Sequence, residues 1–322
     1  MKIGLYDGDG HNFPSLPLMK ISAWHKRQGD SVEWAIPFEH YDRVYVSRVF
    51  GDEYTTFQDF AFNADEVIYG GTGFAIRIDE NGREVYEKTK DVDLPDEIEH
   101  VYPDYSLYPD KTKDTAFGFL TRGCPNNCGF CIVSKKEGII SRKVADLSEW
   151  WRGQKNIELM DANILACRDR LDLLNQLAES GAWVSFEQGL DARFITQEVC
   201  KVLKKIKIKE VHFAFDLMKF EQPILRGLKT YKELVGTKEH DSIVYILTNY
   251  DTTIDEDLYR VEKVKELGYL PDVRIYRKET APQVLIYLQR WCNSRFIYRS
   301  CEFMDYVPHK DGKTIKELYF GH

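Results

Sequence analysis

Three cysteines near the middle of the sequence are the residues best suited to chemistry. Cys124, Cys128 and Cys131 follow a C-x3-C-x2-C pattern directly after the apolar run at 116–120. Thiolates are soft ligands, and clustered thiolates bind zinc or iron–sulfur clusters. Three sulfurs supply three corners of a tetrahedron, so a fourth ligand must come from elsewhere. The pattern predicts a metal or cluster site on the loop at 121–131. The alternatives are a zinc knuckle or three unrelated buried thiols.

Strand and helix patterns alternate after residue 115. Strands are predicted at 116–120, 157–160, 183–188, 210–215, 243–247 and 273–276. Amphipathic helices are predicted between them at 148–153, 168–180, 197–205, 220–234 and 254–267. Repeated strand–helix units indicate an α/β fold with parallel strands, and six units suit a partial (β/α)6 barrel that is open on one side. In such barrels the chemistry lies at the carboxyl ends of the strands.

The N-terminal part predicts a small, open, parallel α/β sheet. Its expected strands are 2–6, 32–36, 43–47 and 66–69, with a helix at 16–28. The loops Asp7–His11 and Gly70–Gly73 follow strands and would line any ligand crevice. Residues 91–114 are acidic and rich in Pro and Tyr, and 102–109 are expected to be extended. The predicted segments are a lobe at 1–90, a linker at 91–114, a barrel at 115–280 and a C-terminal extension at 281–322.

The cysteine loop resembles the cluster loop of the radical S-adenosylmethionine (SAM) superfamily. In that family an aromatic residue precedes the last cysteine, and Phe130 holds this place here. The resemblance implies a [4Fe–4S] cluster on Cys124, Cys128 and Cys131, with one iron left open to SAM. It also implies reductive cleavage of SAM to start radical chemistry on a substrate that we do not identify. An electron donor such as flavodoxin or ferredoxin would supply the electron.

Polar residues lie at or just after the carboxyl ends of the second and third barrel strands. The resemblance implies that Asp161 and Asn163 contact the SAM amino group, and the alternative is that they cap the next helix. Glu187 and Arg193 would approach the SAM carboxylate and ribose, since a guanidinium matches a carboxylate with two parallel hydrogen bonds. The alternative is an internal ion pair of Arg193 with Asp191 or Glu187.

The fourth and fifth strands end on further candidates. The resemblance implies that Asp216 lies near the SAM ribose and that Asn249 lies near the adenine. His212, within the fourth strand, is interpreted as a core group with satisfied hydrogen bonds rather than as a base.

The N-terminal lobe resembles the Rossmann-like, cobalamin-binding-type domain that precedes the barrel in one branch of the superfamily. Cobalamin could bind there, but the sequence has no D-x-H-x-x-G signature, and we favour a lobe that shapes the substrate site. The part of the chain before Cys124 has no cysteine, unlike the N-terminal domain of the methylthiotransferases.

Composition excludes several classes of protein. The 322 residues have a formal charge of −8, which gives no general attraction to nucleic acid or to anionic membranes. No long uncharged apolar run predicts a membrane span or a secretion signal. Seven cysteines, three of them clustered, suit a reducing compartment, so we expect a cytoplasmic protein. A non-catalytic iron–sulfur or zinc-binding sensor remains the alternative function.

Overall fold

The computed structural model of the chain describes residues 1–11, 13–52, 54–58, 60–80, 84–236, 242–309 and 312–321. Contacts between residues divide the chain into two units, Met1–Ser185 and Phe186–His322. Both units contain parallel strands together with helices, which confirms the predicted α/β class. The segment boundaries predicted at residues 90, 114 and 280 stay predictions.

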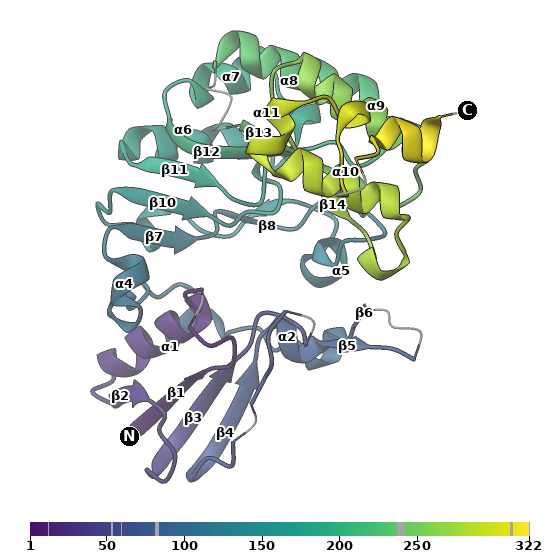
Figure 1. Cartoon of the computed structure of the whole chain (residues 1–322). Helices are drawn as coiled ribbons and strands as arrows, with labels where there is room; N and C mark the ends of the chain where they lie inside the picture. Colours follow the sequence, from purple (N-terminus) through teal and green to yellow (C-terminus); the bar gives the residue numbers. More distant parts are fainter. Residues whose placement is uncertain are drawn as a thin grey trace. The chain divides into compact units, whose positions relative to one another are not determined.

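The first unit begins with a four-stranded parallel sheet (Figure 1). Its strands are β1 (Lys2–Asp7), β2 (Ser31–Trp34), β3 (Tyr41–Ser47) and β4 (Ala64–Gly70), in the order β2-β1-β3-β4. Helix α1 (Leu16–Arg27) connects β1 to β2, and its Leu18 packs in one core cluster with Ile3 and Leu5 of β1. The predicted small parallel sheet is therefore present. Its strand order reverses between β1 and β3, where ligands of such sheets commonly bind.

Short elements follow this sheet. They are α2 (Thr72–Ala75), the antiparallel pair β5 (Ile76–Ile78) and β6 (Glu84–Tyr86), a 3-10 turn at Lys88–Lys90, α3 (Asp96–Glu99), a 3-10 turn at Tyr105–Leu107 and α4 (Pro109–Thr112).

The extended conformation predicted for 102–109 is wrong. Asp104 caps the turn at Tyr105–Leu107, because its carboxylate accepts a hydrogen bond from Ser106 N at 3.1 Å. Pro109 is the first residue of α4, where its missing N–H is not needed. The cap at Asp104 and the helix start at Pro109 therefore form turns in a segment whose Pro and Tyr content predicted an extended chain.

Three strands of a six-stranded sheet belong to the first unit, in the order β11-β10-β7. They are β7 (Thr115–Gly118), β10 (Asn156–Leu159) and β11 (Trp183–Phe186), and β7 and β10 pair in parallel with Ile157 opposite Ala116. The connections contain β8 (Thr121–Arg122), α5 (Val133–Glu137), β9 (Arg142–Lys143), 3-10 turns at Leu147–Glu149 and Ile164–Ala166, and α6 (Arg170–Ser180). The helix predicted at 148–153 is reduced to the first of these turns.

The second unit holds the other three strands of that sheet, in the order β14-β13-β12 (Figure 1). They are β12 (Lys207–Ala214), β13 (Ser242–Thr248) and β14 (Leu270–Ile275), and both pairings are parallel. Helices α7 (Gln197–Leu203), α8 (Glu221–Leu234) and α9 (Ile254–Glu266) lie between or before them in the chain, as predicted. Further 3-10 turns occur at Ala192–Phe194, Met218–Phe220 and Lys278–Thr280.

The C-terminal region packs as helices. It consists of α10 (Gln283–Asn293), α11 (Arg295–Ser300), a 3-10 turn at Phe303–Asp305 and a π-helical turn at Lys316–Phe320. Trp291 of α10 is fully buried and donates a hydrogen bond from Nε1 to Cys301 O at 3.0 Å. None of the helices in the described ranges has the length and apolar character that a membrane crossing requires.

Candidate metal centre

The three clustered cysteines lie on a loop between β8 and α5. Each of them is half-buried. Cys124 N donates to Gly138 O at 3.1 Å, and Cys131 N donates to Cys128 O at 3.0 Å. Ser134 Oγ donates to Asn127 Oδ1 at 2.9 Å, which ties the middle of the loop to the start of α5. The loop is thus held by its own backbone and by the elements on either side of it.

Gly123 fixes the point where the chain enters the loop. Its φ is 92°, and a Cβ at this position would lie 2.2 Å from Ile140 O. Only glycine can adopt this backbone conformation in that space without strain. Its N–H donates to Glu137 Oε2 at 2.9 Å, and Arg122 Nη1 donates to Glu137 Oε1 at 2.7 Å. The Arg122 charge is therefore paired with Glu137.

Asp161 is buried directly after β10 and holds the segment that precedes the cysteine loop. One carboxylate oxygen accepts from Leu120 N at 2.8 Å. The other accepts from Thr121 N at 2.7 Å and from Thr121 Oγ1 at 2.5 Å. Burial raises the pKa of Asp161 to about 7, although the three hydrogen bonds act in the opposite direction. Asp161 positions the loop, and its implied contact with SAM stays a prediction.

Asn163 reaches the first cysteine of the motif. Its Nδ2 lies 3.6 Å from Cys124 Sγ and donates to it. Its Oδ1 accepts from Ala166 N at 3.2 Å, so the helix-cap interpretation is also correct for this residue. Ser141 Oγ donates to Asn163 O at 2.8 Å. The end of β10 therefore contacts the cysteine loop through a side chain predicted as a site residue.

Among the residues that the structure describes, the side chains do not assemble a metal-binding site. In those ranges no group of three or more His, Cys, Asp or Glu side chains could hold a metal ion. The ligand roles of Cys124, Cys128 and Cys131 stay predictions. The donor set nevertheless fits a thiolate-bound metal or cluster, because three half-buried thiols share one anchored loop and an amide N–H points at the first sulfur.

The other four cysteines lie away from this loop in the sequence. Cys167, Cys200 and Cys292 are buried, and burial raises the pKa of all three thiols. A raised pKa keeps a thiol protonated and makes it a poor ligand. Cys301 is half-buried.

Arg193, a predicted SAM-binding residue in the second unit, forms an ion pair with Asp191. Arg193 donates from Nε to Asp191 Oδ1 at 2.8 Å and from Nη2 to Asp191 Oδ2 at 2.7 Å. Its guanidinium carbon also lies 4.2 Å from the centre of the Phe220 ring. The internal ion pair considered as the alternative is thus formed. Glu187 is half-buried, and its backbone oxygen lies 3.0 Å from His212 Nδ1.

Asp216 and Asn249 lie at the carboxyl ends of β12 and β13. Asp216 Oδ1 accepts from Leu247 N at 3.0 Å, and burial raises the pKa of this carboxyl to about 6. Asn249 has a φ of 61° and donates from Nδ2 to Tyr276 O at 2.8 Å. It therefore links the end of β13 to the end of β14. These hydrogen bonds do not test whether Asp216 and Asn249 contact SAM, and both contacts stay predictions.

His212 is a core residue, as interpreted from the sequence. It is 5% exposed. Besides Glu187 O, its ring nitrogens lie 3.0 Å from Glu210 Oε1 and 3.1 Å from Tyr245 Oη. These contacts satisfy both ring nitrogens.

Sequence reasoning missed a polar cluster at the ends of β13 and β14. The rings of Tyr250 and Tyr276 pack edge to face at 5.0 Å, and the Arg277 guanidinium lies 5.4 Å from the Tyr276 ring. Arg277 has a φ of 48°, and Asp251 has a φ of 49°. Left-handed non-glycine residues are costly and often mark functional loops. Tyr276 is the last residue of the predicted strand at 273–276 and Arg277 follows it, so their position at the carboxyl end of a strand was the signal that could have identified them.

The loops that follow β1 and β4 contact the chain itself. Tyr108 Oη donates to Asp7 Oδ2 at 2.7 Å, and Val49 N donates to Asp9 Oδ2 at 2.6 Å. A Cβ on Gly71 would lie 2.3 Å from Arg48 O, so this glycine is needed for close backbone packing. The glycine at position 71 is thus explained without a ligand.

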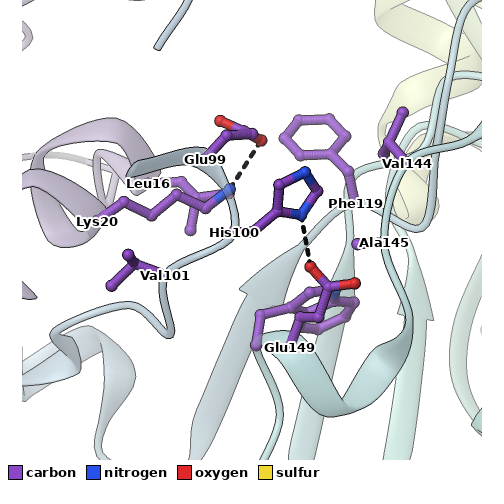
Figure 2. A pocket seen from close by; sticks show the side chains of 10 residues that line it. Leu16, Lys20, Glu99, His100, Val101, Phe119, Val144, Ala145 and Glu149 are labelled. Carbon is purple, nitrogen blue, oxygen red and sulfur yellow. Dashed lines mark hydrogen bonds and ion pairs between the residues drawn. The ribbon is translucent and has the colours of Figure 1, made fainter. Parts of the chain in front are cut away.

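A small cavity lies elsewhere in the first unit (Figure 2). Its volume is about 20 Å³, which is room for about one water molecule. Lys20 Nζ donates to Glu99 Oε1 at 2.8 Å, and His100 Nδ1 lies 2.7 Å from Glu149 Oε2. Burial lowers the pKa of Lys20, and Glu99 opposes this effect. The charged groups pair with one another, and the cavity is too small for a substrate.

The chain was compared with models of known protein families and with curated proteins. No model of a known protein family matches the chain, and no curated protein is significantly similar to it. The residues and their geometry therefore carry the functional argument.

Proposed function

We propose that this protein is a radical SAM enzyme with a [4Fe–4S] cluster on Cys124, Cys128 and Cys131. The observation that carries the proposal is the anchored C-x3-C-x2-C loop, with the amide of Asn163 donating to the first sulfur. When bound, such a cluster supplies the electron that splits SAM into methionine and a 5′-deoxyadenosyl radical, which takes a hydrogen atom from the substrate.

The chain's own residues would prepare the loop for this group. Asp161 holds the segment before the loop through three hydrogen bonds. Gly123 allows the backbone to pass close to Ile140 O. Asn163 donates to the Cys124 sulfur, and a hydrogen bond to the charged form of a ligand favours that form. Phe130, half-buried before the last cysteine, would cover the cluster with apolar surface.

The alternating strands and helices support an open (β/α)6 barrel as the fold of this enzyme. Glu187, Asp216 and Asn249 are the candidates for binding SAM in the second unit. Arg193 would approach SAM as part of its ion pair with Asp191. Asp161 and Asn163 would act mainly on the loop.

The proposal includes a location and a partner. A cytoplasmic location suits clustered thiols, because reducing compartments keep them free of disulfides. The electron donor would be a protein such as flavodoxin or ferredoxin. We favour an N-terminal lobe without cobalamin, since the loops after β1 and β4 pack on the chain itself.

The test is anaerobic reconstitution with iron and sulfide, followed by reduction with dithionite in the presence of SAM. Mass spectrometry would measure 5′-deoxyadenosine. We expect product from the native chain and none from Cys128→Ala. Cys301→Ala, which removes a half-buried cysteine outside the motif, should retain activity. A stable cluster that cleaves no SAM, even with cell extract as a source of substrate, would favour the sensor instead.

A further inference from the structure

The surface beside the cysteine loop combines exposed apolar and basic side chains. We define the Ile139 patch as Lys135, Ile139, Ile140 and Arg142. Ile139 is 61% exposed and Ile140 is 71% exposed. Lys135 and Arg142 are also exposed. Single exposed apolar residues are common, whereas adjoining exposed apolar residues rimmed by polar ones mark interaction surfaces, and here two exposed isoleucines lie between two exposed basic residues in the sequence.

The charges of this patch are open to a partner. No acidic partner is seen for Lys135 or Arg142 in the part of the chain that the structure describes, and Arg142 donates only to the backbone oxygen of Glu137. The neighbouring lysines are already engaged. Lys136 is half-buried and donates to Thr72 Oγ1, and Lys143 pairs with Asp146 at 2.6 Å. The patch is positive although the whole chain carries a formal charge of −8.

The patch is joined directly to the cysteine loop. Gly138 O accepts from Cys124 N at 3.1 Å, and Ile140 O lies against Gly123. Arg142 is opposite Arg122 in the short antiparallel pair of β8 and β9. A molecule bound on Ile139 and Ile140 would therefore lie next to the first cysteine of the motif. Electron transfer needs such closeness between donor and acceptor.

We infer that the Ile139 patch is the docking surface for the acidic electron-carrier protein that reduces the cluster. The inference rests on the proposed function. An acidic carrier would be attracted by Lys135 and Arg142, and the two isoleucines would supply the apolar centre of the contact. The carrier would lose one electron and the cluster would gain it. Redox complexes of this kind have small interfaces and bind weakly, which a patch of this size can provide.

The test uses the full chain, reconstituted with iron and sulfide, and reduced flavodoxin as the probe. Calorimetry at low and high salt would measure binding, and stopped-flow absorbance would measure cluster reduction. In the double variant Lys135→Glu/Arg142→Glu we expect flavodoxin binding to weaken by at least about tenfold, with a smaller salt dependence. Ile140→Asp should also weaken binding, because it places a negative charge at an apolar side chain that is 71% exposed.

Two controls separate docking from cluster loading. Iron content and reduction by dithionite should be the same in the native chain and in these variants, since dithionite is small and needs no docking surface. Lys201→Glu/Arg226→Glu makes the same change in net charge at two exposed cations of α7 and α8 and should leave binding unchanged.

The outcomes distinguish the two proposals. A native chain that takes up no iron overturns the proposed function. A loaded chain that flavodoxin binds and reduces equally well in the native and Lys135→Glu/Arg142→Glu forms overturns the docking surface. Size-exclusion chromatography gives a further outcome, because a dimer that Ile140→Asp abolishes would assign the patch to a second copy of the chain.

Discussion

Asp161 illustrates how one buried carboxylate can both position a loop and respond to pH. Its two oxygens accept from Leu120 N, Thr121 N and Thr121 Oγ1. The threonine hydroxyl can donate to the ionised carboxylate or accept from the protonated form, so the site can hold either state. The backbone N–H groups can only donate, and they lose their partners if the carboxyl is removed.

We predict that Asp161→Ala lowers the free energy of unfolding by about 1–3 kcal/mol for each buried N–H left without an acceptor. Urea denaturation would measure the loss. Asp114→Ala, which removes an exposed carboxylate paired loosely with Lys155, should change stability by less than about 1 kcal/mol. Equal effects of the two substitutions would contradict a positioning role for Asp161.

The pH dependence of this residue has a definite sign. The native pKa of about 7 lies above the ordinary value of 3.8, so the folded chain binds more protons than the unfolded chain between these two values. The contribution of Asp161 to stability therefore falls as the pH rises from about 4 to about 7. Asp161→Asn should lose this component of the slope. Denaturation curves of both proteins across this range would show it, and parallel curves would contradict it.

At the scale of elements, the loop between β8 and α5 depends on one close backbone approach. We predict that Gly123→Ala destabilises the chain by more than about 2 kcal/mol, because the new Cβ meets Ile140 O and the φ is left-handed. Iron uptake on reconstitution should fall as well. Gly138→Ala is the matched control, since Gly138 has a φ of 96° but an alanine Cβ there would have no atom within 4 Å. It should cost only the backbone strain, about 1–3 kcal/mol, and clearly less than Gly123→Ala, which adds the clash with Ile140 O. Similar losses for both would exclude the close contact as the cause.

The ends of β12 and β13 depend on a buried arginine. Arg260 is fully buried and donates to Phe215 O, Asp216 O and Leu247 O at 2.7–2.8 Å. It also pairs with Asp257, which is 1% exposed. We predict that Arg260→Met lowers the free energy of unfolding by about 3–5 kcal/mol, because it leaves a buried carboxylate without its cation.

Thermal and urea unfolding would measure this effect. Arg274→Met removes an exposed arginine that pairs with the half-buried Asp272 and should change stability by about 0–1 kcal/mol. A small loss of stability in both Arg260→Met and Arg274→Met would contradict the prediction, because it would mean that water solvates Asp257 in place of the arginine. The double variant Arg260→Met/Asp257→Leu should recover part of the loss, since it removes both charges together.

At the scale of the whole molecule, the sequence predicted elements better than contacts. The strands near residues 116, 157, 183, 210, 243 and 273 are all present, because alternating apolar runs report burial directly. Side-chain partners were harder to predict. The Asp191–Arg193 pair was predicted only as one of two alternatives. The hydrogen bonds of Thr121 to Asp161 and the contact of Asn163 with Cys124 were not predicted, because they depend on distances that only the folded chain sets. The helix predicted at 197–205 ends at Leu203, and the strand predicted from residue 210 already begins at Lys207.

The state of the cysteine loop should influence the stability of the whole chain. A ligand that binds only the folded form stabilises it in proportion to its affinity. We predict that anaerobic loading with iron and sulfide raises the unfolding temperature of the native chain, that a chelator reverses the rise, and that Cys128→Ala shows no rise. Cys301→Ala should behave like the native chain. Differential scanning calorimetry under argon, with zinc as the competing metal, would measure these shifts. If zinc raises the unfolding temperature and iron with sulfide does not, the loop is a structural zinc site. Zinc also binds clustered thiolates but supports no electron transfer.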